Sequence, residues 1–268
     1  MAQPLWRRAL AEFLGTVLLL TAVVGSGIMA QTLSPHDVGL QLFENSTAIV
    51  FALAVLILVF GPISGAHFNP IVSVADWWLH RRRGDGLTAR HLGVYAAGQF
   101  AGAIAGALLG NAMFAVAPAW STKQRTGAHL WLGEVVATAA LLLLIYALAR
   151  TGRAALAVWA VPAYIGAACW FTSSASFANP AVTLARAFTN TFTGIAPASV
   201  PGFVMAEVVG LVVGVALVVV FYPDEHRDEA VVVADADDAA EVTTPQVRRV
   251  GPQPHHRDSD LVGARQSR

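Results

Sequence analysis

The chain has 268 residues, of which 56% are hydrophobic and 13% are charged, and its formal net charge is zero. This composition is too apolar for an ordinary soluble domain and predicts a membrane protein. Ten of the 17 acidic residues follow Tyr222, so the zero charge averages an apolar body with a polar tail and says little about partners. The single cysteine, Cys169, excludes an intrachain disulfide and a paired-cysteine metal or redox site.

Six apolar segments are long enough to cross a bilayer, whose hydrocarbon core of about 30 Å requires roughly 20 apolar residues per helix. They cover residues 9–30, 46–63, 90–115, 130–149, 157–175 and 201–222. The first is too long for a removable signal peptide and has no clear cleavage site. The sequence therefore predicts an all-α membrane protein with six transmembrane helices.

Basic residues are divided unequally between the two sides of this predicted domain. One side carries Arg7, Arg8, Arg81, Arg82, Arg83, Arg90, Arg150, Arg153 and the arginines of the tail. The other side carries Lys123, Arg125 and Arg186. Because basic loops stay in the cytoplasm, we expect a multi-pass protein of the inner (cell) membrane with both termini cytoplasmic.

Two further apolar segments are too short to span. NPIVSVADWWL (69–79) and NPAVTLARAFT (179–189) would each extend roughly 15 Å as a helix, about half a bilayer. Irregular backbone at membrane depth is tolerated only where protein buries it or where it lines a water-filled cavity. We therefore predict two re-entrant half-helices.

The two halves of the sequence form an internal repeat. Asn69-Pro70 recurs as Asn179-Pro180, and the other matched pairs are Glu12 and Glu134, Thr16 and Thr138, Gln99 and Glu207, Gly102 and Gly210, and Gly106 and Gly214. Each half holds three spans and one half-span. Since three is odd, the second half must enter the membrane inverted.

The repeat and the composition together divide the chain into two parts. Residues 1–222 are predicted to be the membrane domain, with repeat one at about 9–115 and repeat two at about 130–222. Residues 223–268 are predicted to be a disordered cytoplasmic tail. Its His255-His256 pair is weak evidence for a metal site, so we expect neither a metal nor a cofactor.

The two Asn-Pro pairs indicate a constriction where the half-helices meet. Asparagine is a strong N-cap, proline is favoured at the first helical position, and each asparagine amide remains a donor. The positive ends of both helix dipoles would converge there and disfavour cations. We expect a passive pore that admits small uncharged solutes and excludes ions, with a constriction formed by Asn69, Pro70, Ile71, Asn179, Pro180 and Ala181.

SGAHFNP (64–70) and FANPA (177–181) resemble the two signature loops of the major intrinsic protein family, the aquaporins and aquaglyceroporins. The resemblance covers about residues 9–222. It implies a right-handed bundle with one pore per monomer, assembled as a homotetramer in membrane lipid, with small neutral solutes and no nucleic acid as partners. It also implies that Glu12 and Glu134 anchor the re-entrant loops, and we expect His67 to orient the first loop.

The selectivity filter implied by the resemblance departs from the usual family pattern. An arginine usually follows the second Asn-Pro-Ala motif, but this chain has Val182. Family spacing assigns the other filter positions to Ile49, Ala167 and Ser176, all small or apolar. Arg186, one helical turn beyond Val182, either partly restores positive potential at the outer mouth or is an interfacial arginine that snorkels or pairs with loop carbonyls.

The segment NPAVTLARAF is similar to that of aquaglyceroporin-like channels associated with bacterial arsenic resistance. This resemblance implies transport of arsenite or methylated arsenicals in addition to glycerol-like polyols and water. A mainly water-conducting aquaporin is the alternative within the channel class. Glu207 also departs from the family, because the sixth helix often has glutamine there.

Three other classes of protein match parts of the sequence. GSGIMA (25–30) fits a dinucleotide-binding pattern, but its glycines lie at the end of an apolar span instead of following a strand. A secondary transporter shares inverted repeats and broken helices, but the intramembrane carboxylates are explained here as loop anchors. A purely structural tetramer is the third alternative. We expect a channel, not an enzyme.

Overall fold

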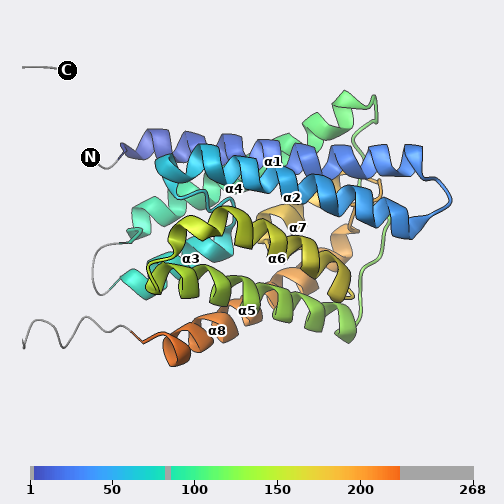
Figure 1. Ribbon diagram of the computed structural model, residues 1–268. Helices are drawn as coiled ribbons and strands as arrows, with labels where there is room; N and C mark the ends of the chain where they lie inside the picture. The colour runs from blue at the N-terminus through green and yellow to red at the C-terminus, as the bar shows by residue number, and fades with distance from the viewer. Residues whose placement is uncertain (1–2, 82–85, 224–268) are drawn as a thin grey trace, which may run out of the picture. The chain divides into compact units, whose positions relative to one another are not determined.

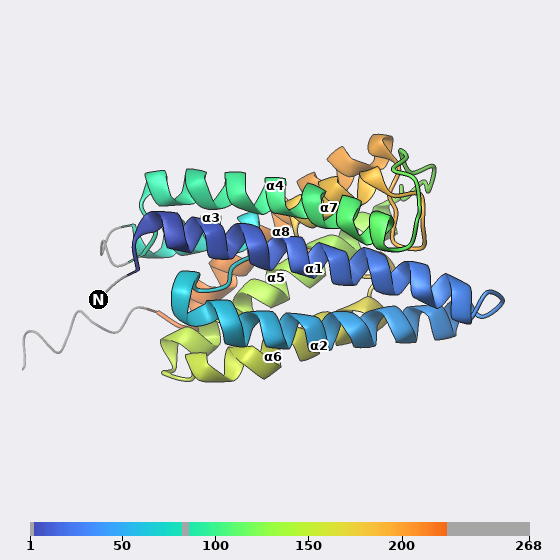
Figure 2. The ribbon, with the colours of Figure 1, turned by 90° about the horizontal axis from the view of Figure 1, so that it is seen from above.

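The computed structural model describes residues 3–81 and 86–223, and the regular structure of these residues is helical (Figures 1 and 2). The long helices are α1 (Leu5–Leu33), α2 (Val38–Ser64), α4 (Ala89–Met113), α5 (Ala128–Arg150), α6 (Ala157–Phe171) and α8 (Val200–Phe221). With the short 3-10 helices η1 (Ala154–Leu156) before α6 and η3 (Pro197–Ser199) before α8, all six are long and apolar enough to cross a membrane. The six predicted spans are confirmed.

Helix α6 is shorter than predicted. It ends at Phe171, whereas the apolar segment suggested residue 175. The C-cap residue Thr172 has φ −101° and ψ 142°, an extended backbone that ends the helix, and Ala175 and Ser176 in the loop beyond it have φ values of +61° and +47°. Composition did not reveal this end, because the loop that follows is itself largely buried.

Two shorter helices begin at the Asn-Pro pairs. Helix α3 (Pro70–His80) follows Asn69, and α7 (Pro180–Ala185) follows Asn179 and continues as the 3-10 helix η2 (Arg186–Phe188). Figures 1 and 2 place α3 and α7 in opposite halves of the bundle. At 11 and 6 residues neither can span, so the predicted re-entrant half-helices are confirmed.

Glycines allow two helices within each repeat to approach closely. Helix α1 packs along α4, and α5 packs along α8. A Cβ atom at Gly106 would lie 2.2 Å from the carbonyl oxygen of Val17, and one at Gly214 would lie 2.9 Å from that of Ala139. Small residues that permit such backbone contact are typical of helix interfaces in membranes.

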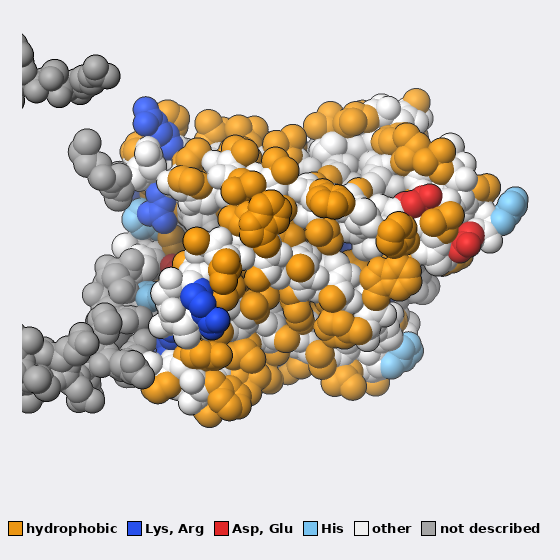
Figure 3. All heavy atoms as spheres, in the orientation of Figure 1, with side chains coloured by type: hydrophobic (Ala, Val, Ile, Leu, Met, Phe, Trp, Pro, Cys, Tyr) orange, Lys and Arg blue, Asp and Glu red, His pale blue; other side chains and the backbone are white. Residues whose placement is uncertain are grey.

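The outer surface of the bundle is apolar. Figure 3 shows hydrophobic side chains across the middle of the visible face and basic side chains toward the end that holds the N-terminus. Large exposed apolar residues include Phe51, Val55, Trp159, Val212 and Val220. This surface suits a lipid environment. The predicted tail, apart from Pro223, lies outside the described residues.

Candidate functional site

Each half-helix is capped by its own asparagine. Asn69 Oδ1 accepts a hydrogen bond of 2.9 Å from the N–H of Ile71. Asn179 Oδ1 accepts bonds of 3.0 and 3.3 Å from the N–H groups of Ala181 and Val182. These bonds satisfy backbone donors that a helix N-terminus otherwise leaves free.

The same asparagines also connect the two repeats by hydrogen bonds. Asn69 Nδ2 donates a bond of 2.7 Å to the carbonyl oxygen of Ala178, and Asn179 Nδ2 donates one of 2.8 Å to that of Phe68. Each amide carries two N–H groups, so one remains after this reciprocal bond. Both asparagines line a cavity inside the helical bundle.

The loops before the half-helices are strained and are held by glutamates. Phe68 and Ala178 have φ values of +50° and +48°, which non-glycine residues rarely adopt and which cost of order 1–3 kcal/mol each. Glu12 Oε2 accepts a bond of 2.7 Å from the N–H of Phe68, and Glu134 Oε2 accepts one of 2.7 Å from that of Ala178. Both carboxylates are fully buried.

His67 lies in the first of these loops. Its N–H donates a bond of 3.0 Å to Glu12 Oε1, and its ring Nδ1 lies 3.1 Å from the Ser73 hydroxyl. The side chain therefore links the loop to α3, the half-helix that the loop precedes. His67 also lines the cavity.

Glu207 breaks the symmetry between the two repeats. In the first repeat, Gln99 Nε2 donates bonds of 2.8 Å to Glu12 and 3.0 Å to Ser73. In the second, Glu207 Oε1 accepts bonds of 3.1 Å from the Asn179 N–H and 2.6 Å from the Thr183 hydroxyl. Glu207 therefore caps the second half-helix directly, a role that the sequence comparison did not identify.

A cavity of about 790 Å³ runs past the junction of the half-helices. Its lining includes Asp76 and His80 near the end of α3, the two asparagines, and Arg186 beyond α7. Part of its wall is apolar and is formed by Leu19, Val23, Leu53, Ile57 and Val161. Polar donors and an apolar wall thus face the same passage.

The structure places three of the four expected filter residues on the cavity. Ile49, Ser176 and Val182 line it, whereas Ala167 is exposed and lines a shallow depression between α2 and α6. Along α6 the cavity is lined by Val161, Ile165 and Cys169, which recur every fourth residue. Ala167 precedes Cys169 by two positions, about 200° around the helix, so its assignment by family spacing was wrong.

One mouth of the cavity is basic. Lys123, Arg125 and Arg186 line it together with Phe177 and Phe192. The Arg186 guanidinium carbon lies 3.4 Å from the centroid of the Phe177 ring, and its Nε donates to the carbonyl oxygen of Thr193. Arg186 therefore both contacts a loop carbonyl and faces the cavity, so the two interpretations offered above are not exclusive.

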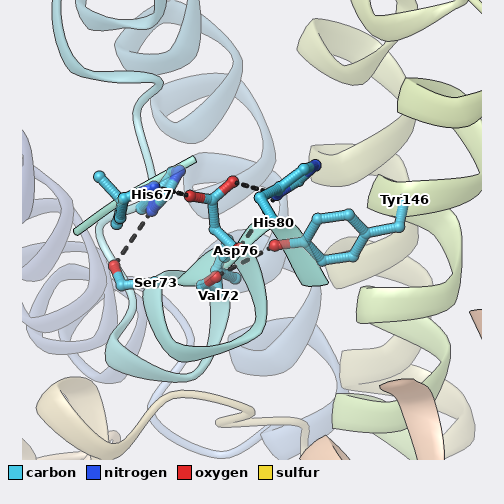
Figure 4. A network of polar contacts seen from close by, with 7 residues as sticks. His67, Val72, Ser73, Asp76, His80 and Tyr146 are labelled. Carbon is cyan, nitrogen blue, oxygen red and sulfur yellow. Dashed lines mark hydrogen bonds and ion pairs between the residues drawn. The ribbon is translucent and has the colours of Figure 1, made fainter. Parts of the chain in front are cut away.

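The opposite mouth carries a polar network (Figure 4). The Asp76 carboxylate lies between the rings of His67 and His80, with His80 Nδ1 at 3.2 Å. The Tyr146 hydroxyl donates a bond of 3.2 Å to the Val72 carbonyl oxygen. Burial tends to raise the pKa of Asp76, but the His80 hydrogen bond, the nearby His67 and the Leu87 N–H together lower it below its ordinary value.

The fold and this cavity define a class: six membrane-spanning helices surround a passage interrupted by two facing half-helices, as in aquaporin-like channels. The chain belongs to the major intrinsic protein family, whose model matches residues 1–176. Members of this family are channels, not enzymes. The match confirms the family inferred from the two signature loops.

Individual relatives agree with this assignment. The chain is 51% identical over 214 residues to "Aquaglyceroporin AqpS" of Rhizobium meliloti (strain 1021), which covers 80% of this chain and 89% of that protein. It is 30% identical over 174 residues to "Aquaporin AqpM" of Methanothermobacter marburgensis, covering 56% and 68% of the two chains. The X-ray structure of the aquaglyceroporin from Plasmodium falciparum matches with a TM-score of 0.59 at 20% identity, covering 85% of this chain and all of that one, which supports the fold.

Proposed function

We propose that this protein is a passive channel for small uncharged solutes, which include glycerol-like polyols, arsenite or methylated arsenicals, and water. The observation that carries the proposal is the apolar filter region. Ile49, Cys169, Ser176 and Val182 line the cavity, and Val182 stands where most of the family has an arginine after the second motif. The absence of a charged side chain at the position of Val182, beside the apolar Ile49, lowers the cost of desolvating a bulky neutral solute.

The amphipathic wall supports a polyol as substrate. Asn69 and Asn179 each retain one amide N–H after the reciprocal bonds, and the facing wall is aliphatic. A polyol can present its hydroxyl oxygens to the donors and its carbon chain to the aliphatic side. The relative named "Aquaglyceroporin AqpS" is consistent with this class of solute, and arsenite, a compact neutral hydroxy compound, has similar requirements.

Ion exclusion follows from the half-helices. The positive ends of α3 and α7 face the same point, and the remaining asparagine N–H groups are donors. Neither feature can replace the hydration shell of a cation. Arg186 adds positive charge at one mouth. We assign the constriction to Asn69, Asn179 and their neighbours, and the loop anchoring to Glu12, Glu134 and His67.

We also propose a homotetramer in the inner membrane with both termini cytoplasmic. The apolar outer surface and the arginines at the terminal end support this orientation (Figure 3). The basic mouth is then the outer one, and the mouth with Asp76 is the inner one. Residues 1–222 form the channel domain, with repeats at about 9–115 and 130–222.

The test compares solute permeabilities by stopped-flow light scattering on proteoliposomes. Wild type should pass glycerol and arsenite as well as water. Val182→Arg should reduce glycerol permeability about tenfold or more, since about 1.4 kcal/mol of added barrier is enough for that factor. Val182→Met, which lengthens the side chain without adding charge, is the control for size. A wild type that passes water alone would identify a mainly water-conducting aquaporin and overturn the proposal.

A further inference from the structure

The basic mouth brings three cationic side chains onto two aromatic rings. Lys123 Nζ and Arg125 Nη2 both donate bonds of 3.4 Å to the Phe192 carbonyl oxygen, which places these charges beside each other. Arg125 and Arg186 both face the Phe177 ring, with their guanidinium carbons 5.3 and 3.4 Å from its centroid. The three residues come from distant segments, the loop after α4 and η2 after α7.

The charge of this cluster is not balanced by the protein around it. None of the three cations forms an ion pair within residues 3–81 and 86–223. Glu134 is the carboxylate that acts electrostatically on Arg125 and Arg186. Its two oxygens already accept the N–H groups of Phe177 and Ala178. Three like charges at a partly desolvated mouth are costly unless an anion joins them.

Free donors of the cluster face the cavity. Arg186 uses Nε, and Arg125 uses Nε and Nη2, for bonds to loop carbonyls. The two terminal nitrogens of Arg186 and Nη1 of Arg125 have no hydrogen bond to the described residues, and none is a buried unpartnered atom. Both side chains line the cavity, so these nitrogens are reachable from it. The loop carbonyls hold the guanidinium groups in place.

From this geometry we propose that the basic mouth is a binding site for a small oxyanion, held between Lys123, Arg125 and Arg186. Guanidinium groups present paired N–H donors that match the oxygens of sulfate, phosphate or a carboxylate, and the lysine adds a point charge. A bound oxyanion occupies the mouth through which a neutral solute must pass. Oxyanions therefore compete with solute entry from this side.

Binding and transport are tested separately, because only the second rests on the proposed channel function. Sulfate binding to the purified full-length protein is measured by isothermal titration calorimetry at constant ionic strength. Lys123→Gln and Arg125→Gln should each weaken sulfate binding about tenfold, the usual worth of a hydrogen bond to a charged group. Arg153→Gln is the matched control, since Arg153 is exposed and bonds only to its neighbour Thr151 among the described residues.

The transport arm measures glycerol flux into proteoliposomes with sulfate or chloride outside. Sulfate should slow wild-type flux, and the slowing should be lost in Lys123→Gln but kept in Arg153→Gln. Absence of sulfate binding to wild type, or equal loss in Lys123→Gln and Arg153→Gln, overturns the oxyanion site. Sulfate binding with the expected variant pattern but without glycerol flux supports the site and overturns the proposed function instead.

Discussion

The side-chain amide of Asn179 donates a hydrogen bond of 2.8 Å to the carbonyl oxygen of Phe68, which lies in the other repeat. Asn69 and Ala178 form the matching bond at 2.7 Å. These two bonds join the half-helices at the centre of the cavity. The same asparagine side chains therefore cap the half-helices, hold the repeats together and offer donors to the passage.

Replacing Asn179 by aspartate separates its capping of the half-helix from its hydrogen bond to the other repeat. Asn179→Asp keeps an acceptor for the Ala181 and Val182 N–H groups but removes the donor to Phe68. We expect a loss of about 1–3 kcal/mol in the free energy of unfolding, the usual cost of leaving a buried polar group unpaired. Chemical denaturation in detergent measures it.

Asn190→Asp is the control for that variant. Asn190 is exposed, and its Oδ1 accepts bonds from Thr122 that an aspartate can also accept. Equal stability losses in the two variants would show that the bond between Asn179 and Phe68 contributes nothing specific.

The corrected lining of α6 can be checked with thiol reagents. Cys169 lines the cavity and is the single cysteine of the chain, so a charged methanethiosulfonate reagent should inhibit glycerol flux in wild type and not in Cys169→Ser. Adding Ala167→Cys to the Cys169→Ser background should leave flux insensitive, because residue 167 lies outside the cavity. Inhibition of the double variant would return residue 167 to the filter.

Close packing between α1 and α4 predicts opposite outcomes for two glycines of α4. Gly106→Ala places a methyl group 2.2 Å from the Val17 carbonyl oxygen and should destabilise the protein by about 1–3 kcal/mol. Gly93→Ala meets nothing within 4 Å and should be neutral or stabilising by up to about 1 kcal/mol, as alanine is the better helix former. Thermal unfolding in detergent ranks the variants, and a stable Gly106→Ala would contradict the interface.

Sulfate binding should depend on pH through Lys123. Burial, and then the charges of Arg125 and Arg186, lower the pKa of Lys123 below 10.5. Affinity is full while the ammonium is protonated and falls as pH rises through this lowered pKa, earlier than for an ordinary lysine. Lys123→Arg stays charged, so its calorimetric affinity should remain constant over the same range. A similar decline in that variant would assign the titration to another group.

Several features of the fold followed from the sequence because they depend on local composition. Apolar segments of about 20 residues can be satisfied in lipid only as helices, so the six spans were predictable. The two Asn-Pro pairs and the short apolar segments after them predicted the half-helices. The odd number of spans per repeat required the second repeat to be inverted. The position of Val182 could also be assigned from the sequence, because this residue immediately follows the second Asn-Pro-Ala motif.

Other features were decided only when distant segments met. The side of α6 that faces the cavity depends on how the helix is rotated against its neighbours, so Cys169 lines the passage where spacing had suggested Ala167. The basic mouth joins Lys123 and Arg125 to Arg186, about sixty residues later, and no motif links them. Local pattern determines which segments enter the membrane, whereas packing determines which side chains share one space and what charge they produce there.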